Sequence, residues 1–278
     1  MIVDTHLHLI DKAKLSYPWL RNVPTLDRDF SQDDYAREAH RAGIEAALFM
    51  EVDVDAADIE AELAYVEALA RAPESLLRGA IVACRPEEAG FAAWLEKVQA
   101  NPFVKGFRRV LHVVPDDVSE QPLFRQNVGR IAGSGLTFDL CVLPRQMRQA
   151  FALVDFAPDV PFVLDHCGVP DIKGGGLHPW KEQIAEMAKR PNVWAKVSGI
   201  VAYADADSWT VDTLRPYVEH TITSFGWERV VWGSDWPVCK LGGGLAGWVT
   251  ATHALLAGAS ADERTKLLSA NAKRRWRL

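Results

Sequence analysis

Two histidines, His6 and His8, stand one residue apart in the opening segment MIVDTHLHLI. Residues two apart on a strand point to the same face, so both imidazoles can be directed at one point. A single histidine in an apolar strand is usually a core residue whose hydrogen bonds are satisfied. Two histidines at this spacing, shortly after Asp4, favour a chemical site if later segments supply partners.

Three later apolar segments end in polar or charged residues. These residues are Asp165 and His166 in FVLDHCG, Asp235 in VVWGSDWP, and Arg108 and Arg109 in KGFRR. A charged group directly after an apolar run is costly unless it is paired or functional. Taken singly, Asp165 and Asp235 could cap turns, because aspartate often accepts backbone N–H bonds there. Taken together, the three segments predict one shared site.

The residues of this predicted site are suited to hydrolysis. The set consists of His6, His8, His166 and Asp235. Three imidazoles and a carboxylate can hold one divalent ion, with zinc as the expected metal, and leave a position open for water. Without a metal, the imidazoles could donate hydrogen bonds to a carbonyl oxygen while Asp235 acts as general base. Both arrangements lead to attack of water on an acyl carbon.

Eight apolar segments, separated by stretches with helical spacing, can position these residues. The segments are 1–9, 45–52, 77–84, 104–111, 136–143, 161–167, 193–199 and 229–236. An eightfold alternation of strand and helix in one chain predicts an α/β fold, a single (β/α)8 TIM barrel over residues 1–278. An open doubly wound sheet is the alternative, but the segment HLHLIDKAK lacks the glycine-rich phosphate loop of that fold. In a barrel, catalytic groups come from the carboxyl ends of the strands, where these residues fall.

The composition is that of a globular protein without a nucleic-acid or membrane partner. Hydrophobic residues make up 49% of the chain, and the formal net charge of −6 comes from acidic and basic residues mixed along it. We find no apolar stretch of ~18 residues and no secretory signal at the start. The four cysteines are far apart and form no CxxC pair, which is typical of reduced thiols in a cytoplasmic protein.

With these motifs assembled, the chain resembles the amidohydrolase superfamily, and within it the branch of sugar lactonases and pyrone-dicarboxylate lactonases. The motifs that carry the resemblance are VDTHLHL, YPWL, KGFRRVLH, FDLCVLPRQM, VLDHCGVPDIKGG, NVWAKVSGI and WGSDWPVCKLGG, in this order. They extend over nearly the whole chain, so the evidence is much stronger than HxH alone. The resemblance implies a barrel hydrolase that opens aldono-1,4- or 1,5-lactones, such as those of fucose or rhamnose.

The resemblance also implies roles for the four site residues. Asp235 would be the base that activates water. His6, His8 and His166 would polarise the carbonyl group or, with Asp235, hold a single divalent ion that the reaction could also dispense with. We find no lysine or glutamate in a central strand that could bridge two metals, so a binuclear centre is not expected.

Other strand-end residues are candidate substrate contacts: Arg108, Asp139, Lys196, Trp236 and His112. Arg108 matches the arginine of the family's GFR segment, whereas the direction of its neighbour Arg109 is open. A mixture of donors and acceptors suits the hydroxyls of a neutral sugar lactone. Trp236 could stack on the apolar face of such a ring.

Two other functions and a second lactone class compete with this prediction. A metal-dependent decarboxylase of aromatic or muconate-like acids uses the same histidine and aspartate pattern, but its planar acids would call for a ring of arginines. A pyrone-dicarboxylate lactonase would share the hydrolytic centre and differ in the groups that bind substrate. A non-enzymatic barrel that binds a sugar acid is disfavoured by the cluster of titratable groups.

Overall fold

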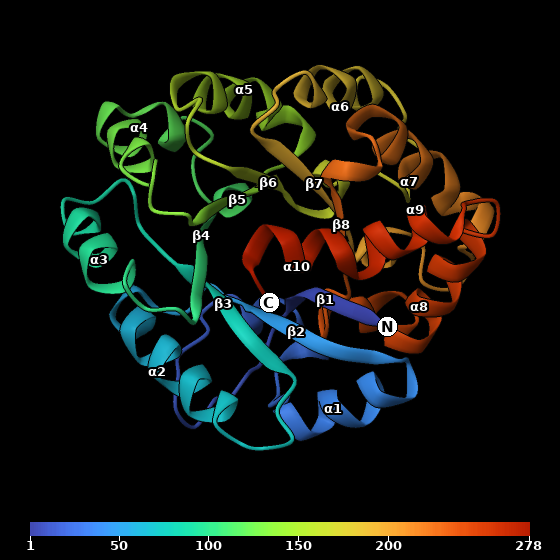
Figure 1. Cartoon of the computed structure of the whole chain (residues 1–278), viewed down its shortest axis with the longest axis horizontal. Coiled ribbons are helices and arrows are strands. Elements are labelled where there is room, and N and C mark those ends of the chain that lie inside the picture. The colour runs from blue at the N-terminus through green and yellow to red at the C-terminus, as the bar shows by residue number, and fades with distance from the viewer.

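The computed structural model describes residues 1–278 and contains eight parallel strands that follow one another in a single sheet. A helix follows each strand and packs outside the ring of strands (Figure 1), which confirms the predicted (β/α)8 barrel. The strands are β1 Ile2–Leu7, β2 Ile44–Met50, β3 Leu77–Ala83, β4 Val104–Val110, β5 Thr137–Cys141, β6 Phe162–Leu164, β7 Val193–Ser198 and β8 Val230–Gly233. The helices are α1 Gln32–Arg41, α2 Ile59–Ala70, α3 Phe91–Val98, α4 Pro122–Gly129, α5 Met147–Phe156, α6 Trp180–Ala188, α7 Val211–Phe225, α8 Gly244–Leu255, α9 Ala261–Thr265 and α10 Asn271–Trp276.

The local sequence explains where several elements begin and end. Helix α1 starts at a capping box in which the Ser31 hydroxyl accepts the Asp34 N–H and the Asp34 carboxylate accepts the Ser31 N–H. Strand β6 is shorter than the predicted segment 161–167, because the backbone turns into the left-handed region at His166, where φ is 52°. The strands are near-continuous apolar runs because a parallel barrel buries both of their faces.

The barrel closes between β1 and the residues that follow β8, and we call this junction the seam. The Asp235 N–H donates to the His6 carbonyl at 2.8 Å, and the His8 N–H donates to the Trp236 carbonyl at 2.8 Å. Leu7 and Trp236 form a parallel bridge there. The seam therefore joins, through the backbone, the segment that carries His6 and His8 to the segment that carries Asp235.

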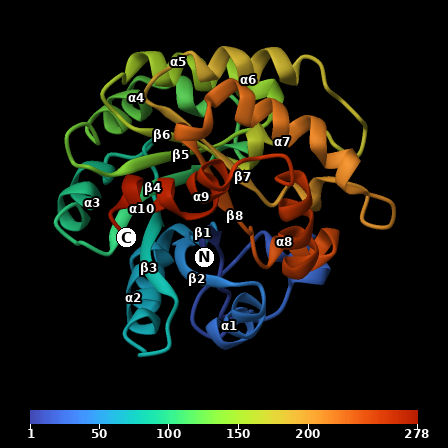
Figure 2. The ribbon, with the colours of Figure 1, turned by 45° about the vertical axis from the view of Figure 1, so that its right-hand side comes forward.

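Helix α10 covers the amino end of the barrel. Figures 1 and 2 show it lying across one end of the ring of strands, beside the start of the chain. Trp276 packs in a buried cluster with Val3 and Val231, and its Nε1–H donates to Thr137 Oγ1 at 3.3 Å. Because the amino end is filled in this way, a site can open only at the carboxyl ends of the strands.

No helix has both the length and the apolar character needed to cross a bilayer.

Candidate hydrolytic site

The four residues predicted to form the site come together at the carboxyl ends of the strands. Asp235 Oδ1 lies 3.3 Å from His8 Nε2 and 3.6 Å from His6 Nε2. The ring centroids of His6 and His166 are 4.4 Å apart, and those of His6 and His8 are 4.9 Å apart. All four side chains are buried. Residues separated by more than 220 positions in the sequence thus form one compact cluster.

The hydrogen bond of His8 defines which of its nitrogens is free. His8 Nδ1 lies 2.9 Å from the Met50 carbonyl oxygen, which can only accept, so Nδ1 carries the hydrogen. The lone pair of Nε2 then faces the Asp235 carboxylate at 3.3 Å. Two acceptors at this distance repel each other unless a proton or a cation lies between them. Asp235 Oδ2 is also buried and has no hydrogen-bond partner. This donor set therefore fits a cation.

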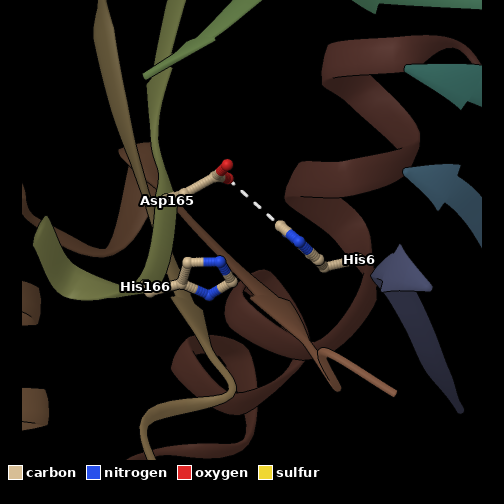
Figure 3. A group of neighbouring side chains, drawn as sticks. All are labelled: His6, Asp165 and His166. Atoms are coloured by element: carbon tan, nitrogen blue, oxygen red, sulfur yellow. Dashed lines mark ion pairs between the residues drawn. The ribbon is translucent and has the colours of Figure 1, made fainter. Parts of the chain in front are cut away.

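The possible metal ligands form two overlapping sets that share His6. One set is His6, His8 and Asp235; the other is His6, Asp165 and His166, and within each set the ligand atoms lie within 4.8 Å of one another. Figure 3 shows the second set, with the Asp165 carboxylate directed at the His6 ring and His166 beside it. His166 Nδ1 also lies 3.9 Å from Asp235 Oδ2, so His166 borders both sets.

Asp165 is a site residue whose role was not predicted from the sequence. It directly follows an apolar strand, the same signal that identified Asp235. Its Oδ1 lies 3.5 Å from His6 Nδ1 and 2.8 Å from Lys196 Nζ. Burial would raise the pKa of Asp165, but the positive charge of Lys196 and the contact with His6 hold this pKa well below its usual range. Asp165 is therefore an anion in the interior of the barrel.

Burial keeps the central imidazoles neutral. It lowers the pKa of His6 well below its usual range, and the charge of Lys196 lowers it further. Burial also lowers the pKa of His166, although Asp235 opposes this effect. His166 Nδ1 contacts Ser198 Oγ at 2.9 Å, which orients the ring. Neutral imidazoles can bind a metal ion, whereas imidazolium ions cannot.

Asp235 adopts a backbone conformation that is unusual for aspartate, with φ of 58°. Two neighbours support it. Asp4 Oδ1 accepts the Ser234 N–H at 2.7 Å, which fixes the turn that leads into Asp235. Gly199 packs against the side chain, and a Cβ built on Gly199 would lie 2.3 Å from Asp235 Cβ. The absence of a side chain at Gly199 thus makes room for the carboxylate.

Arg108 reaches the site and is held there by Glu51. Its Nε donates to Glu51 Oε1 at 2.5 Å, its Nη2 donates to the Glu51 carbonyl at 2.7 Å, and its Nη1 lies 3.2 Å from His6 Nε2. Arg109 instead donates to Glu87 Oε1 at 2.8 Å and does not line the cavity. Glu51 was missed in the sequence, although it directly follows an apolar strand as Asp165 and Asp235 do.

Asp139 and Lys196 do not lie where the sequence analysis expected them. Both side chains are fully buried, and Lys196 Nζ donates to Asp139 Oδ2 at 2.6 Å. Cys141, two residues further along β5, lines the cavity, so Asp139 lies one layer deeper in the barrel. Burial would lower the pKa of Lys196, but Asp139 and Asp165 raise it above its usual range. The prediction that Asp139 and Lys196 face substrate hydroxyls is corrected accordingly.

Trp236 also lies outside the cavity wall, contrary to prediction. Its ring is fully buried, and its Nε1–H donates to Glu38 Oε1 at 3.3 Å. The tryptophan that lines the cavity is Trp19, in the YPWL motif, and its Nε1–H donates to the Val52 carbonyl at 2.8 Å. His112 does line the cavity, and its Nδ1 lies 3.2 Å from Cys141 Sγ. No pattern in the sequence indicated how the loop after β1 would bring Trp19 to the site.

The cavity above the cluster has a volume of about 380 Å³. His8, His166, Asp235 and Arg108 line its base. Its remaining polar residues are Asn22, Asp53, His112 and Tyr203, and the rest of the wall is mostly apolar. A small ring-shaped molecule therefore fits above the reactive cluster.

Comparisons with known proteins agree with this architecture. An L-fucono-1,5-lactonase of Burkholderia ambifaria is 27% identical over 245 residues, covering 87% of this chain and 82% of the relative. An L-rhamnono-gamma-lactonase of Scheffersomyces stipitis is 24% identical over 185 residues, covering 59% of this chain and 55% of the relative. The crystal structure of a Burkholderia multivorans amidohydrolase with bound zinc matches with a TM-score of 0.89 at 23% identity, covering 100% of this chain and 99% of the other; at this identity the match shows the fold.

The family comparison covers almost the entire chain. The model of the amidohydrolase family matches residues 3–278, which include every residue of the cluster described above. The resemblance seen in the motifs is thereby confirmed. The chain belongs to the amidohydrolase family.

Proposed function

We propose that this protein hydrolyses the cyclic ester of a sugar lactone, an aldono-1,4- or 1,5-lactone. The observation that carries the proposal is the buried Asp235 carboxylate, which lines the cavity and has one oxygen without a hydrogen-bond partner. A carboxylate in this position can accept a proton from water beside a bound acyl group. The lactonases among the relatives of this chain support the same class of reaction.

The proposed reaction adds water across the ester bond of the ring. Asp235 takes a proton from a water molecule, and the oxygen of that water attacks the carbonyl carbon. The proton then passes from Asp235 to the ring oxygen as the bond between the carbonyl carbon and the ring oxygen breaks. The product is an open-chain hydroxy acid. Arg108, which lines the cavity, supplies positive charge near the developing oxyanion. His8 keeps its Nε2 lone pair toward the same point because the Met50 carbonyl holds the hydrogen on Nδ1.

A divalent ion fits this site, and His6, His8 and Asp235 would hold it. Imidazole and carboxylate ligands with one position left for water are typical of catalytic zinc, so we propose zinc as the metal. When bound, the ion would polarise the carbonyl group and lower the pKa of water. With or without a bound ion, the protein residues orient the substrate and transfer the proton.

The charges in the cavity favour a neutral lactone over a dicarboxylate. Arg108 is the cationic side chain in the wall, and the Glu51 carboxylate neutralises it by accepting a hydrogen bond from its Nε. Asp53 also lines the cavity and would repel a carboxylate. Asn22 and Tyr203 can pair with hydroxyls, and Trp19 can stack on the apolar face of a sugar ring. These residues replace Asp139 and Lys196 as the basis for the sugar assignment.

The test is kcat/KM for three substrate classes at one pH: aldonolactones, a pyrone dicarboxylate, and aromatic or muconate-like acids monitored for CO2 release. We expect hydrolysis of one or more aldonolactones and little reaction with the others. A preference for the dicarboxylate would overturn the sugar assignment and keep the hydrolytic centre. Release of CO2 without lactone hydrolysis would overturn the proposed reaction. Asp235→Asn serves as the control that any activity comes from this site.

A further inference from the structure

Lys196 is a buried cation in the interior of the barrel, beneath the cavity. It extends from β7, and its side chain is fully buried. Two carboxylate oxygens lie next to its Nζ, Asp139 Oδ2 at 2.6 Å and Asp165 Oδ1 at 2.8 Å, and His6 Nδ1 lies 3.2 Å away. An ammonium group is a compact point charge, so it can occupy the same kind of position as a small metal ion.

Two of the atoms around Lys196 also belong to a possible metal site. His6 and Asp165, with His166, form one of the two sets of ligands that converge in this structure. Lys196 Nζ lies 3.2 Å from His6 Nδ1, whereas Asp235 Oδ1 and Arg108 Nη1 lie 3.6 Å and 3.2 Å from His6 Nε2. The Arg108 guanidinium approaches the same Asp165 carboxylate, with Nη1 at 3.6 Å from Oδ2. The set of His6, Asp165 and His166 thus already contacts two positive charges, those of Lys196 and Arg108.

The second set is different. Arg108 Nη1 lies 3.2 Å from His6 Nε2, but neither a lysine nor an arginine pairs with Asp235, whose ion-pair partners are His6, His8 and His166. The two carboxylates therefore differ in their neighbours: Asp165 faces the cationic side chains of Lys196 and Arg108, whereas Asp235 faces imidazole rings. An added cation is thus needed at Asp235 and not at Asp165.

We propose that Lys196 is a positioning residue that serves as a built-in cation. Its ammonium group takes the place of a metal ion in the set of His6, Asp165 and His166. The set of His6, His8 and Asp235 is then the single exchangeable cation site of the chain. Lys196 also holds Asp165 beside His6 Nδ1, and this contact fixes the His6 ring for its role on the Nε2 side.

This inference rests on the cation site of the proposed function, but it does not depend on which lactone is hydrolysed. It is tested without substrate. The purified protein is stripped of metal with a chelator, reloaded with zinc, separated from free zinc by gel filtration, and analysed for zinc per chain. We expect about one zinc ion for the wild type, the count of a mononuclear site. Two tightly bound ions in the wild type would overturn the proposal, whatever the lactone assay shows.

The decisive variant is Lys196→Met, which keeps the length of the side chain and removes its charge. We expect it to bind a second zinc ion, because Asp139 and Asp165 then lack their cation, and zinc should raise its melting temperature more than that of the wild type. An ion pair that is merely structural would leave the zinc count unchanged. A folded Lys196→Met protein that still binds only one zinc ion would therefore overturn the proposal.

Two further variants complete the test. Lys240→Met removes a lysine that pairs with Glu38 outside the cluster, and its zinc count should equal that of the wild type. Removal of Lys196 leaves the carboxylates of Asp139 and Asp165 without their cation. If Lys196→Met does not fold, the double variant Asp139→Asn/Lys196→Met removes one of these two buried charges. We expect this double variant to fold and to bind the second ion through the Asp165 set. A folded double variant with the wild-type zinc count would overturn the role of Lys196.

Discussion

Gly199 offers a test of how closely the position of Asp235 controls the reaction. Its φ of +57° lies in the left-handed region, and it packs directly against the Asp235 side chain. In Gly199→Ala, the new Cβ would lie 2.3 Å from both Asp235 Cβ and Asp235 Oδ2, whereas ordinary contacts begin at 3.4 Å. Asp235 must therefore move, because a methyl group is rigidly attached to the backbone.

The size of the effect follows from this distance. Moving Asp235 Cβ from 2.3 Å to 3.4 Å is a shift of about 1 Å, and a misplacement of ~1 Å in a catalytic group can cost ~100-fold in rate. That factor corresponds to about 2.7 kcal/mol of transition-state stabilisation. Alanine in a left-handed conformation also costs about 1–2 kcal/mol of stability. We expect both losses in Gly199→Ala.

Gly43→Ala is the matched control. Gly43 also has a positive φ, +73°, but a Cβ there would meet nothing within 4 Å. Both variants should lose stability from backbone strain, as measured by urea unfolding, and Gly199→Ala should lose more because of its contact with Asp235. Only Gly199→Ala should lose about 100-fold in kcat/KM on the best aldonolactone. Equal activities in the two folded variants would refute the view that Gly199 positions the carboxylate.

Three other predictions concern single side chains. Asp235→Asn should lower kcat by at least ~100-fold with an unchanged circular dichroism spectrum, as expected for loss of a general base. Burial lowers the pKa of His112 to about 4, against 6.5 as its usual value, so below pH 6.5 the unfolded state binds a proton that the folded state does not. Wild-type stability should therefore fall by about 1.4 kcal/mol more than that of His112→Asn between about pH 7.5 and 5.5, as measured by urea unfolding. Glu51→Gln should leave the charge of Arg108 uncompensated. The ratio of kcat/KM for carboxylated lactones to kcat/KM for neutral lactones should then rise about tenfold, the scale of one charge-assisted hydrogen bond. An unchanged ratio would contradict the view that Glu51 neutralises this arginine.

The reactive cluster could be predicted because its residues interrupt apolar runs. His6, Asp165, His166 and Asp235 each stand at the end of a strand, and the carboxyl ends of all barrel strands meet at one face. Once eight strands had been recognised, the fold implied that these residues would converge. Glu51 carried the same signal and could have been found in the same way.

The depth of a side chain could not be predicted from the same pattern. Asp139 and Cys141 both belong to β5, yet only Cys141 reaches the cavity. Which layer faces the cavity depends on the stagger of all eight strands, and no single segment encodes that stagger. Trp19 was missed for a related reason, because its place in the wall depends on the path of the loop after β1.

The seam also makes the site dependent on the last stage of barrel assembly. His6 and Asp235 are paired through the backbone, but 228 positions separate them in the sequence. During synthesis, a nascent chain can fold several β and α units before the residues that complete the seam have left the ribosome. In such an intermediate, His6 and His8 do not yet face Asp235, and the cavity is not closed. A ligand that binds across the seam favours the closed barrel over partly opened forms, so it should slow amide exchange most in β1 and in the segment after β8.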